Sequence, residues 1–150
     1  MVNFHDVPSQ KLIGALAEQM KTVPGIEEPQ WAKYVKTGSH AERVPHESDW
    51  WFTRAASLMR KLYLHGPIGV GDLKRAYGGS KARAYFPKHH MDAGGSNIRK
   101  ILMQLETAEL VAKTPKGRIL TPKGTAMMDK TSNVIFKAAV ETDKAMARYG

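Results

Sequence analysis

The chain has no cysteine and no hydrophobic run long enough to cross a membrane. The first absence excludes disulfides, thiolate zinc sites and cysteine nucleophiles. A membrane span needs about 18 to 20 apolar residues, and the N-terminal sequence also lacks the basic start and apolar run of a signal peptide. We therefore expect a soluble, cytoplasmic protein that does not act at a membrane.

Acidic residues are scarce in one third of the sequence. The 150 residues include 23 Lys and Arg against 14 Asp and Glu, a net charge of +9. The segment 50–100 holds ten basic residues but only Asp72 and Asp92 as acids, so it carries +8 of that charge. Each Lys or Arg that lies near a phosphate releases counterions and adds affinity. The concentration of charge therefore indicates a nucleic acid as partner.

Motifs for catalysis and for metal or cofactor binding are missing as well. The six histidines are scattered, and no H-E-x-x-H pattern surrounds the adjacent pair His89 and His90. The stretch GVGDLKRAYGG lacks both the preceding apolar strand of a dinucleotide site and the G-K-[ST] of a P-loop. Sparse carboxylates leave few groups for acid–base catalysis in the basic third. We predict a protein that is not an enzyme and has no metal, cofactor or small-molecule substrate.

One helix, predicted over residues 50–65, dominates the hydrophobic pattern. Its apolar side chains cover an arc of about 160°, wider than the stripe of roughly 100° on a surface helix, so other elements should surround it. Ser48 or Asp49 is predicted to cap its first turn. The apolar arc comprises Trp51, Phe52, Ala55, Ala56, Leu58, Met59, Leu62 and Tyr63. We expect Trp51 to be a core anchor. The other arc holds Trp50, Arg54, Ser57 and Lys61, with Arg60 at its edge, and we interpret Trp50 as flanking a binding face.

The elements before and directly after this helix are predicted to be short. A first helix follows Pro8-Ser9, with Leu12, Ala15, Leu16 and Met20 at helical spacing. A short helix in the segment 29–38 should pack Trp31, Tyr34 and Val35 on the core. Val70, Leu73 and Tyr77 predict another short helix, which Gly78 and Gly79 close as a C-cap.

The C-terminal half predicts a helix, a hairpin and a last helix. Ser96 is expected to cap a helix over residues 97–110. Strands at 110–113 and 118–121 are joined by a Pro-Lys-Gly turn, and Thr121-Pro122 starts a helix running toward Tyr149. The apolar face of the first of these helices is formed by Ile98, Ile101, Leu102, Leu105 and Ala108. The order predicts one mainly α domain over residues 1–150, a helical bundle around the central helix with a two-stranded β-hairpin, winged-helix-like. Residues 1–5 and about 140–150 are expected to fray.

The stretch between the two Gly-Gly pairs, Gly78-Gly79 and Gly94-Gly95, is predicted to be a long cationic loop. Glycine lets a backbone approach a sugar-phosphate chain closely, and Lys81, Arg83 and Lys88 would then contact phosphates. Tyr85 and Phe86 lie among these cations. Two interpretations stay open for them: stacking on exposed RNA bases, or pinning the loop to the core.

Several motifs together resemble one known family. DWWFTRAASLMRKLYLHGPIGVGDLKRAYGG, KARAYFPKHH, GGSNIRKILMQLE and GRILTPKG, in this order and spacing, are similar to the archaeal and eukaryotic small-subunit ribosomal protein family nineteen-e. The resemblance runs from about residue 6 to about residue 129. It implies a structural, ribosomal RNA-binding protein in the head of the small subunit, with a part in maturing the precursor RNA and the subunit. Its partners would be that RNA, its precursor and neighbouring small-subunit proteins.

The resemblance also implies which residues contact RNA or serve assembly. These are Trp50, Arg54, Ser57 and Arg60 in the central helix, Gly78, Gly79 and Arg83, and Arg99 and Lys100 near the start of the later helix. The position after Gly-Gly is usually basic in the family but is Ser80 here, so Lys81 becomes the candidate for that contact. With Lys61 and Lys88, these residues form the predicted RNA-binding set. The alternative is a winged-helix DNA-binding transcription regulator that reads DNA with residues 96–104, although Arg54, Arg60 and Lys61 lie on a helix that such regulators bury.

Overall fold

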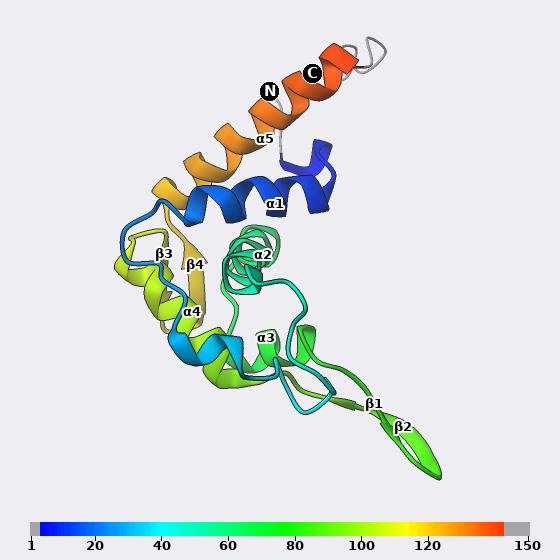
Figure 1. Cartoon of the computed structure of the whole chain (residues 1–150). Coiled ribbons are helices and arrows are strands. Elements are labelled where there is room, and N and C mark those ends of the chain that lie inside the picture. Colours follow the sequence, from blue (N-terminus) through cyan, green and yellow to red (C-terminus); the bar gives the residue numbers. More distant parts are fainter. Residues whose placement is uncertain (1–3, 143–150) are drawn as a thin grey trace.

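The structure is a computed structural model, and it describes residues 4–142. Two short 3-10 turns, η1 and η2, five α-helices and two antiparallel two-stranded sheets make up this part of the chain (Figure 1). In chain order the elements are η1 (Phe4–Asp6), α1 (Ser9–Met20), η2 (Gln30–Lys33), α2 (Trp50–His65), α3 (Val70–Ala76), β1 (Gly79–Arg83), β2 (Phe86–Met91), α4 (Gly95–Thr107), β3 (Val111–Thr114), β4 (Gly117–Leu120) and α5 (Pro122–Thr142). The fold is mainly α, as predicted.

Helix α2 lies at the centre of the molecule. Figure 1 shows it end-on, with α1 and α5 above it, α4 and the β3–β4 hairpin beside it and α3 below. Trp51 is fully buried, which confirms its prediction as a core anchor. Trp50 is also buried, at 7% exposure, and its indole Nε1 donates a hydrogen bond to the carbonyl of Ala32 at 3.2 Å.

The winged-helix arrangement is built from α2, α3, α4 and the β3–β4 hairpin. Strands β3 and β4 pair from Val111↔Leu120 to Thr114↔Gly117, one residue from the predicted bounds. Ile68 adds a bridge to Arg118, with N···O distances of 3.0 and 3.1 Å, and so ties the segment after α2 to the wing. The predicted apolar face of α4 is buried against this core.

The two ends of the described chain pack on the same side of α2. Phe4 is buried against the ring of Tyr63, so the expected fraying of residues 4 and 5 is not found. Thr121 caps α5 as predicted, since its Oγ1 accepts a hydrogen bond from the N–H of Gly124 at 3.2 Å. The predicted continuation of this helix to Tyr149 lies outside the described residues beyond Thr142.

Three predicted caps and one predicted packing contact are wrong. Asp49 precedes α2, but its carboxylate bonds Lys21 and Ser48 instead of the helix N–H groups. Helix α4 already includes Ser96 and begins after Gly94, without a side-chain cap. Helix α3 ends at Ala76, the C-cap position is Tyr77 with an ordinary negative φ, and Gly79 opens a strand. Tyr34 is 81% exposed, because the turn at η2 buries Ala32 in place of the tyrosine.

The predicted cationic loop is a second β-hairpin, which we call the arm and define as residues 79–91. Strands β1 and β2 pair from Gly79↔Met91 to Arg83↔Phe86, with a bulge between Lys81 and Arg83. In Figure 1 the arm extends away from the helices. Almost every residue in it is exposed. Of the helices described, none is long and apolar enough to cross a membrane.

Candidate nucleic-acid interface

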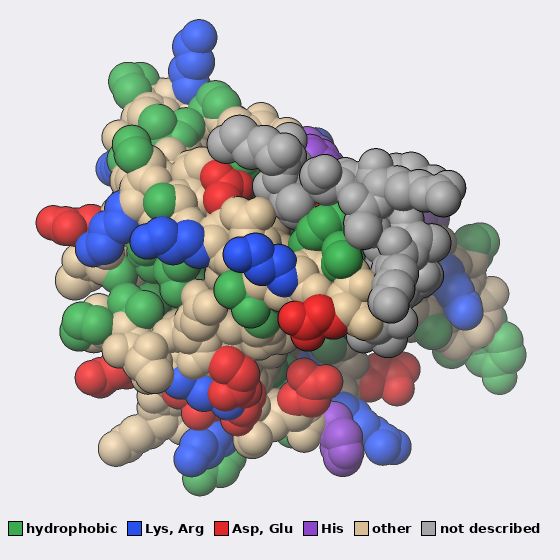
Figure 2. Space-filling view, turned by 90° about the horizontal axis from the view of Figure 1, so that it is seen from above, with side chains coloured by type: hydrophobic (Ala, Val, Ile, Leu, Met, Phe, Trp, Pro, Cys, Tyr) green, Lys and Arg blue, Asp and Glu red, His purple; other side chains and the backbone are tan. Residues whose placement is uncertain are grey.

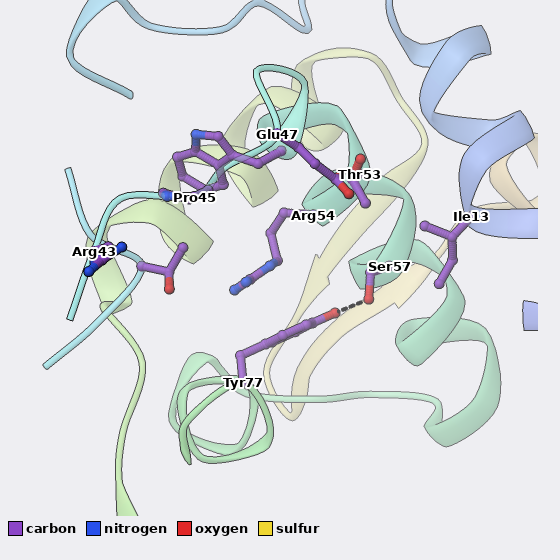
Figure 3. A pocket seen from close by; sticks show the side chains of 10 residues that line it. Ile13, Arg43, Pro45, Glu47, Thr53, Arg54, Ser57 and Tyr77 are labelled. Carbon is purple, nitrogen blue, oxygen red and sulfur yellow. Dashed lines mark hydrogen bonds between the residues drawn. The ribbon is translucent and has the colours of Figure 1, made fainter. Parts of the chain in front are cut away.

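A pocket of about 440 Å³ opens beside the N-terminal half of α2. Residues from α1, from the segment 37–47 and from α2 line it, together with Tyr77 at the end of α3 (Figure 3). The lining residues are Ile13, Thr37, Arg43, Pro45, Glu47, Trp50, Thr53, Arg54, Ser57 and Tyr77. Three of the predicted RNA-binding residues, Trp50, Arg54 and Ser57, therefore meet in one concave site.

Helical spacing brings the polar groups of this pocket together. Arg54 and Ser57 are three residues apart and lie on the same face of α2. The Arg54 guanidinium carbon lies 4.3 Å from the centre of the Tyr77 ring, a cation–π contact. The Ser57 and Tyr77 hydroxyls are 2.7 Å apart, and Figure 3 shows this bond with Arg54 extended over the ring. Tyr77 thus fixes the direction in which the guanidinium points.

Two further cations of α2 lie near the same ring. The Lys61 Nζ is 5.2 Å from the Tyr77 ring centre. The Nε atom of Arg60 is buried without a hydrogen-bond partner in the described chain. The arc of α2 that the sequence assigned to binding therefore converges on Tyr77. Tyr77 itself was predicted only as an apolar position of α3, and its i+4 spacing from Leu73 gave no signal of this second role.

No residue that the structure describes neutralises the charge of Arg54. Within residues 4–142 it makes neither an ion pair nor a hydrogen bond. The pocket also contains one acidic residue, Glu47, and a second basic residue, Arg43, so the charges of these two cancel and that of Arg54 remains. Burial lowers the pKa of the Arg54 guanidinium, with Tyr77 opposing the shift. An arginine nevertheless stays cationic in proteins. Burial also raises the pKa of Tyr77, so its hydroxyl is neutral. The pocket therefore offers an anion the positive charge of Arg54 beside the neutral ring of Tyr77.

The arm carries Lys81, Arg83 and Lys88 with no acidic residue between 79 and 91. All three side chains are exposed. By contrast, the end of the molecule over α1 and α5 shows basic and acidic side chains intermingled (Figure 2). A second pocket of about 300 Å³ at the root of the arm is lined by Lys36, Lys81 and Lys88 and by one acidic residue, Glu42. The arm is a surface of one sign, as a phosphate-binding element requires.

The Gly-Gly pairs serve contacts within the protein. A Cβ on Gly78 would lie 2.4 Å from the carbonyl oxygen of Met91, and one on Gly79 would lie 3.1 Å from the ring of His40. The N–H of Gly94 donates to Thr37 at 2.7 Å. Gly78 and Gly79 therefore let the root of the arm pack closely on neighbouring chain segments. Their predicted contact with RNA stays a prediction, as does that of the arm cations.

Arg99 and Lys100 lie in the first turns of α4, apart from the Arg54 pocket. Both are exposed, and the Lys100 Nζ lies 4.5 Å from the centre of the Trp31 ring. Gln104, further along this helix, donates to the carbonyl of Glu27 at 2.7 Å and accepts from Trp51. The segment that includes η2 thus lies against α4. Ser96, Arg99 and Met103 on the same helix remain exposed.

The remaining candidates for chemistry do not assemble. No group of three or more His, Asp or Glu side chains that would hold a metal ion is found in the part of the chain that the structure describes. His90 lies 3.6 Å from Asp92, and both side chains are about half exposed. This pair belongs to the root of the arm. The positively charged elements are therefore the features on which a functional assignment depends.

Comparison with known proteins adds independent evidence. The family described as ribosomal protein S19e matches residues 3–138. A small ribosomal subunit protein eS19 from Aeropyrum pernix is 44% identical to the chain, with 99% of each sequence covered. The eS19 protein of Thermoplasma acidophilum is 40% identical over 99% of both sequences. The eS19A protein of Schizosaccharomyces pombe is 39% identical, with 93% of this chain and 98% of the relative covered.

Proposed function

The chain belongs to the ribosomal protein S19e family, and from this premise we propose that it binds ribosomal RNA as a structural constituent of the small ribosomal subunit. In this proposal residues 1–150 act as one RNA-binding domain without catalytic activity. The protein works in the cytoplasm, in the head of the subunit, and contacts neighbouring small-subunit proteins there. It also supports maturation of the precursor RNA and of the subunit.

The observation that carries the proposal is the half-buried charge of Arg54, which has no ion-pair partner among residues 4–142. Burying a charge without a partner is costly, so a group that completes the site gains the interaction that the free protein lacks. A phosphate offers oxygens that match the two-pronged donor geometry of a guanidinium. The Tyr77 ring holds Arg54 in position at 4.3 Å, which limits the side-chain entropy lost on binding. An RNA phosphate is therefore the proposed occupant.

The other predicted residues extend this contact along the RNA. Lys61 and Arg60 lie next to the pocket, and Arg99 is exposed at the start of α4. Lys81, Arg83 and Lys88 line the arm. Contacts from several separate elements to one RNA would hold its segments in a fixed relation, and this is the physical basis for the proposed role in subunit maturation.

Binding measurements with the purified protein test the proposal against the DNA-binding alternative. Small-subunit ribosomal RNA should bind more tightly than a DNA duplex with the same number of phosphates. The logarithm of the binding constant should fall linearly with the logarithm of salt concentration, with a slope of about −0.7 to −0.9 for each phosphate contacted. A flat salt dependence, or preference for the DNA duplex, would contradict the assignment.

Two experiments in cells that make the protein test the finer parts. Crosslinking within purified small subunits, followed by sequencing of the attached RNA, should recover the RNA of the head. Depletion of the protein should cause precursor RNA to accumulate and the number of mature small subunits to fall. Normal RNA processing after depletion would limit the protein to a structural role in the finished subunit.

A further inference from the structure

Two aromatic side chains lie uncovered at the tip of the arm. Tyr85 is 99% exposed and Phe86 is 73% exposed, where the turn joins β1 to β2. Within residues 4–142 they are the only two large exposed hydrophobic side chains that are adjacent in sequence. The interpretation that they pin this segment to the core is therefore wrong. Exposed apolar groups of this size commonly mark a contact surface.

The surroundings of these rings identify the chemistry of the partner. The arm has three cations and no acid, so it attracts a polyanion and has no complement for a basic protein surface. Arg83 and Phe86 are cross-strand partners, so their side chains are neighbours on one face of the hairpin. A positive group beside an open ring is the combination that binds single-stranded nucleic acid, in which phosphates and base faces alternate along the chain.

Whether the RNA is paired or unpaired at the contact follows from which base faces an exposed ring can reach. Within a duplex, the faces of the bases are covered by their neighbours, and the deep, narrow major groove of A-form RNA excludes side chains. Loops, bulges and ends present open base faces. We propose that Tyr85 and Phe86 stack on unpaired bases of an RNA whose phosphates are held by Lys81, Arg83 and Lys88. This proposal rests on the proposed function, because it specifies how the same protein engages RNA.

The root of the arm holds the tip at a defined distance from the Arg54 pocket. Ala93, just after β2, donates its N–H to the carbonyl of Lys74 at 3.0 Å and bridges Gly38. Gly94 donates to Thr37, which also lines the Arg54 pocket. The arm and the pocket therefore share one support. Stacking at the tip would fix the orientation of an RNA that the pocket holds by a phosphate.

Two RNA probes separate stacking from charge. The first is a stem-loop whose unpaired loop contains 2-aminopurine, and the second is a blunt RNA duplex with the same number of phosphates. The test variant is the double substitution Tyr85→Ala and Phe86→Ala, which removes exposed rings and leaves the core intact. Val134→Ala on α5, another exposed apolar position, is the matched control. Lys81→Gln with Lys88→Gln is the charge control.

The aromatic double variant should lose affinity for the stem-loop by about 5-fold to about 140-fold for each stacked base, the equivalent of about 1 to 3 kcal/mol. Its affinity for the duplex and the salt slope on both probes should match those of the wild type. The wild type should change the 2-aminopurine fluorescence, and the variant should not. The lysine double variant should instead reduce the salt slope by up to about 1.8 on both probes.

Two results would overturn the proposal. One is an unchanged affinity of the aromatic variant for the stem-loop, and the other is an equal loss of affinity for the duplex. If a variant with unchanged affinity also fails to enter small subunits, the rings contact a protein instead. Failure of the wild type to bind either RNA would instead contradict the proposed function itself.

Discussion

Replacing Arg54 by methionine should separate RNA binding from stability. Methionine keeps most of the apolar length of the side chain against the Tyr77 ring but removes the charge. The free protein loses a cation–π contact worth about 0.5 to 2 kcal/mol. It also loses a half-buried charge that has no ion-pair partner in the described chain. Removing such a charge relieves its desolvation cost, and this gain in stability is similar in size to the loss of the cation–π contact. We therefore expect the free energy of unfolding to change by no more than about 1 kcal/mol.

The effects of Arg54→Met on stability and on RNA binding are measured by different assays. A change of 1 kcal/mol shifts the Tm of a chain of this size by about 2 to 4 °C, so thermal unfolding should give a Tm within that interval of the wild type. RNA binding should weaken much more. Hydrogen bonds to a charged group contribute about 1.5 to 3 kcal/mol, so Arg54→Met should lower affinity for small-subunit ribosomal RNA by about 10-fold to about 140-fold.

Arg75→Met is the matched control, because Arg75 is exposed on α3 and lies outside the residues that line the pocket. It removes the same charge and should cost less affinity than Arg54→Met. A fall in Tm of more than about 8 °C for Arg54→Met would show that Arg54 serves the fold. Unchanged RNA affinity with an unchanged Tm would show that the pocket does not hold a phosphate.

The remaining predictions concern the fold. Trp51→Ala should lower the free energy of unfolding by about 3 to 5 kcal/mol, because the indole is fully buried; an unchanged Tm would contradict that. Gly78→Ala should loosen the root of the arm, because the added Cβ meets a strand carbonyl at 2.4 Å, and faster amide exchange in the arm would report it. Gly71→Ala, a helical site with open space around it, should instead stabilise α3. The ion pair with Lys21 lowers the pKa of Asp49, so its contribution is present above about pH 4 and is lost as pH falls through the lowered folded value. Thermal unfolding between pH 7 and pH 3 should show this loss, and Asp49→Asn should remove it.

The helices and the wing were predictable because they bury one face. In α2 and α4 the apolar residues repeat at helical spacing, and in the wing Pro115-Lys116-Gly117 marks the turn. The arm was missed because almost all of its residues on both faces are exposed. A strand is recognised in sequence by alternation of buried and exposed residues, and β1 and β2 have none.

Part of the predicted site also followed from local sequence features, and part depended on tertiary packing. The amino-acid sequence by itself determined the basic middle third, the absence of thiol chemistry and the arc of α2 that carries Arg54, Ser57 and Lys61, since these depend on composition and local helical geometry. Only the tertiary structure decided that Trp50 is buried and that Tyr77 lies under the Arg54 guanidinium. Tyr77 is 23 positions along the chain from Arg54, and contacts at that separation depend on how α3 packs against α2. Local spacing carries no information about that packing.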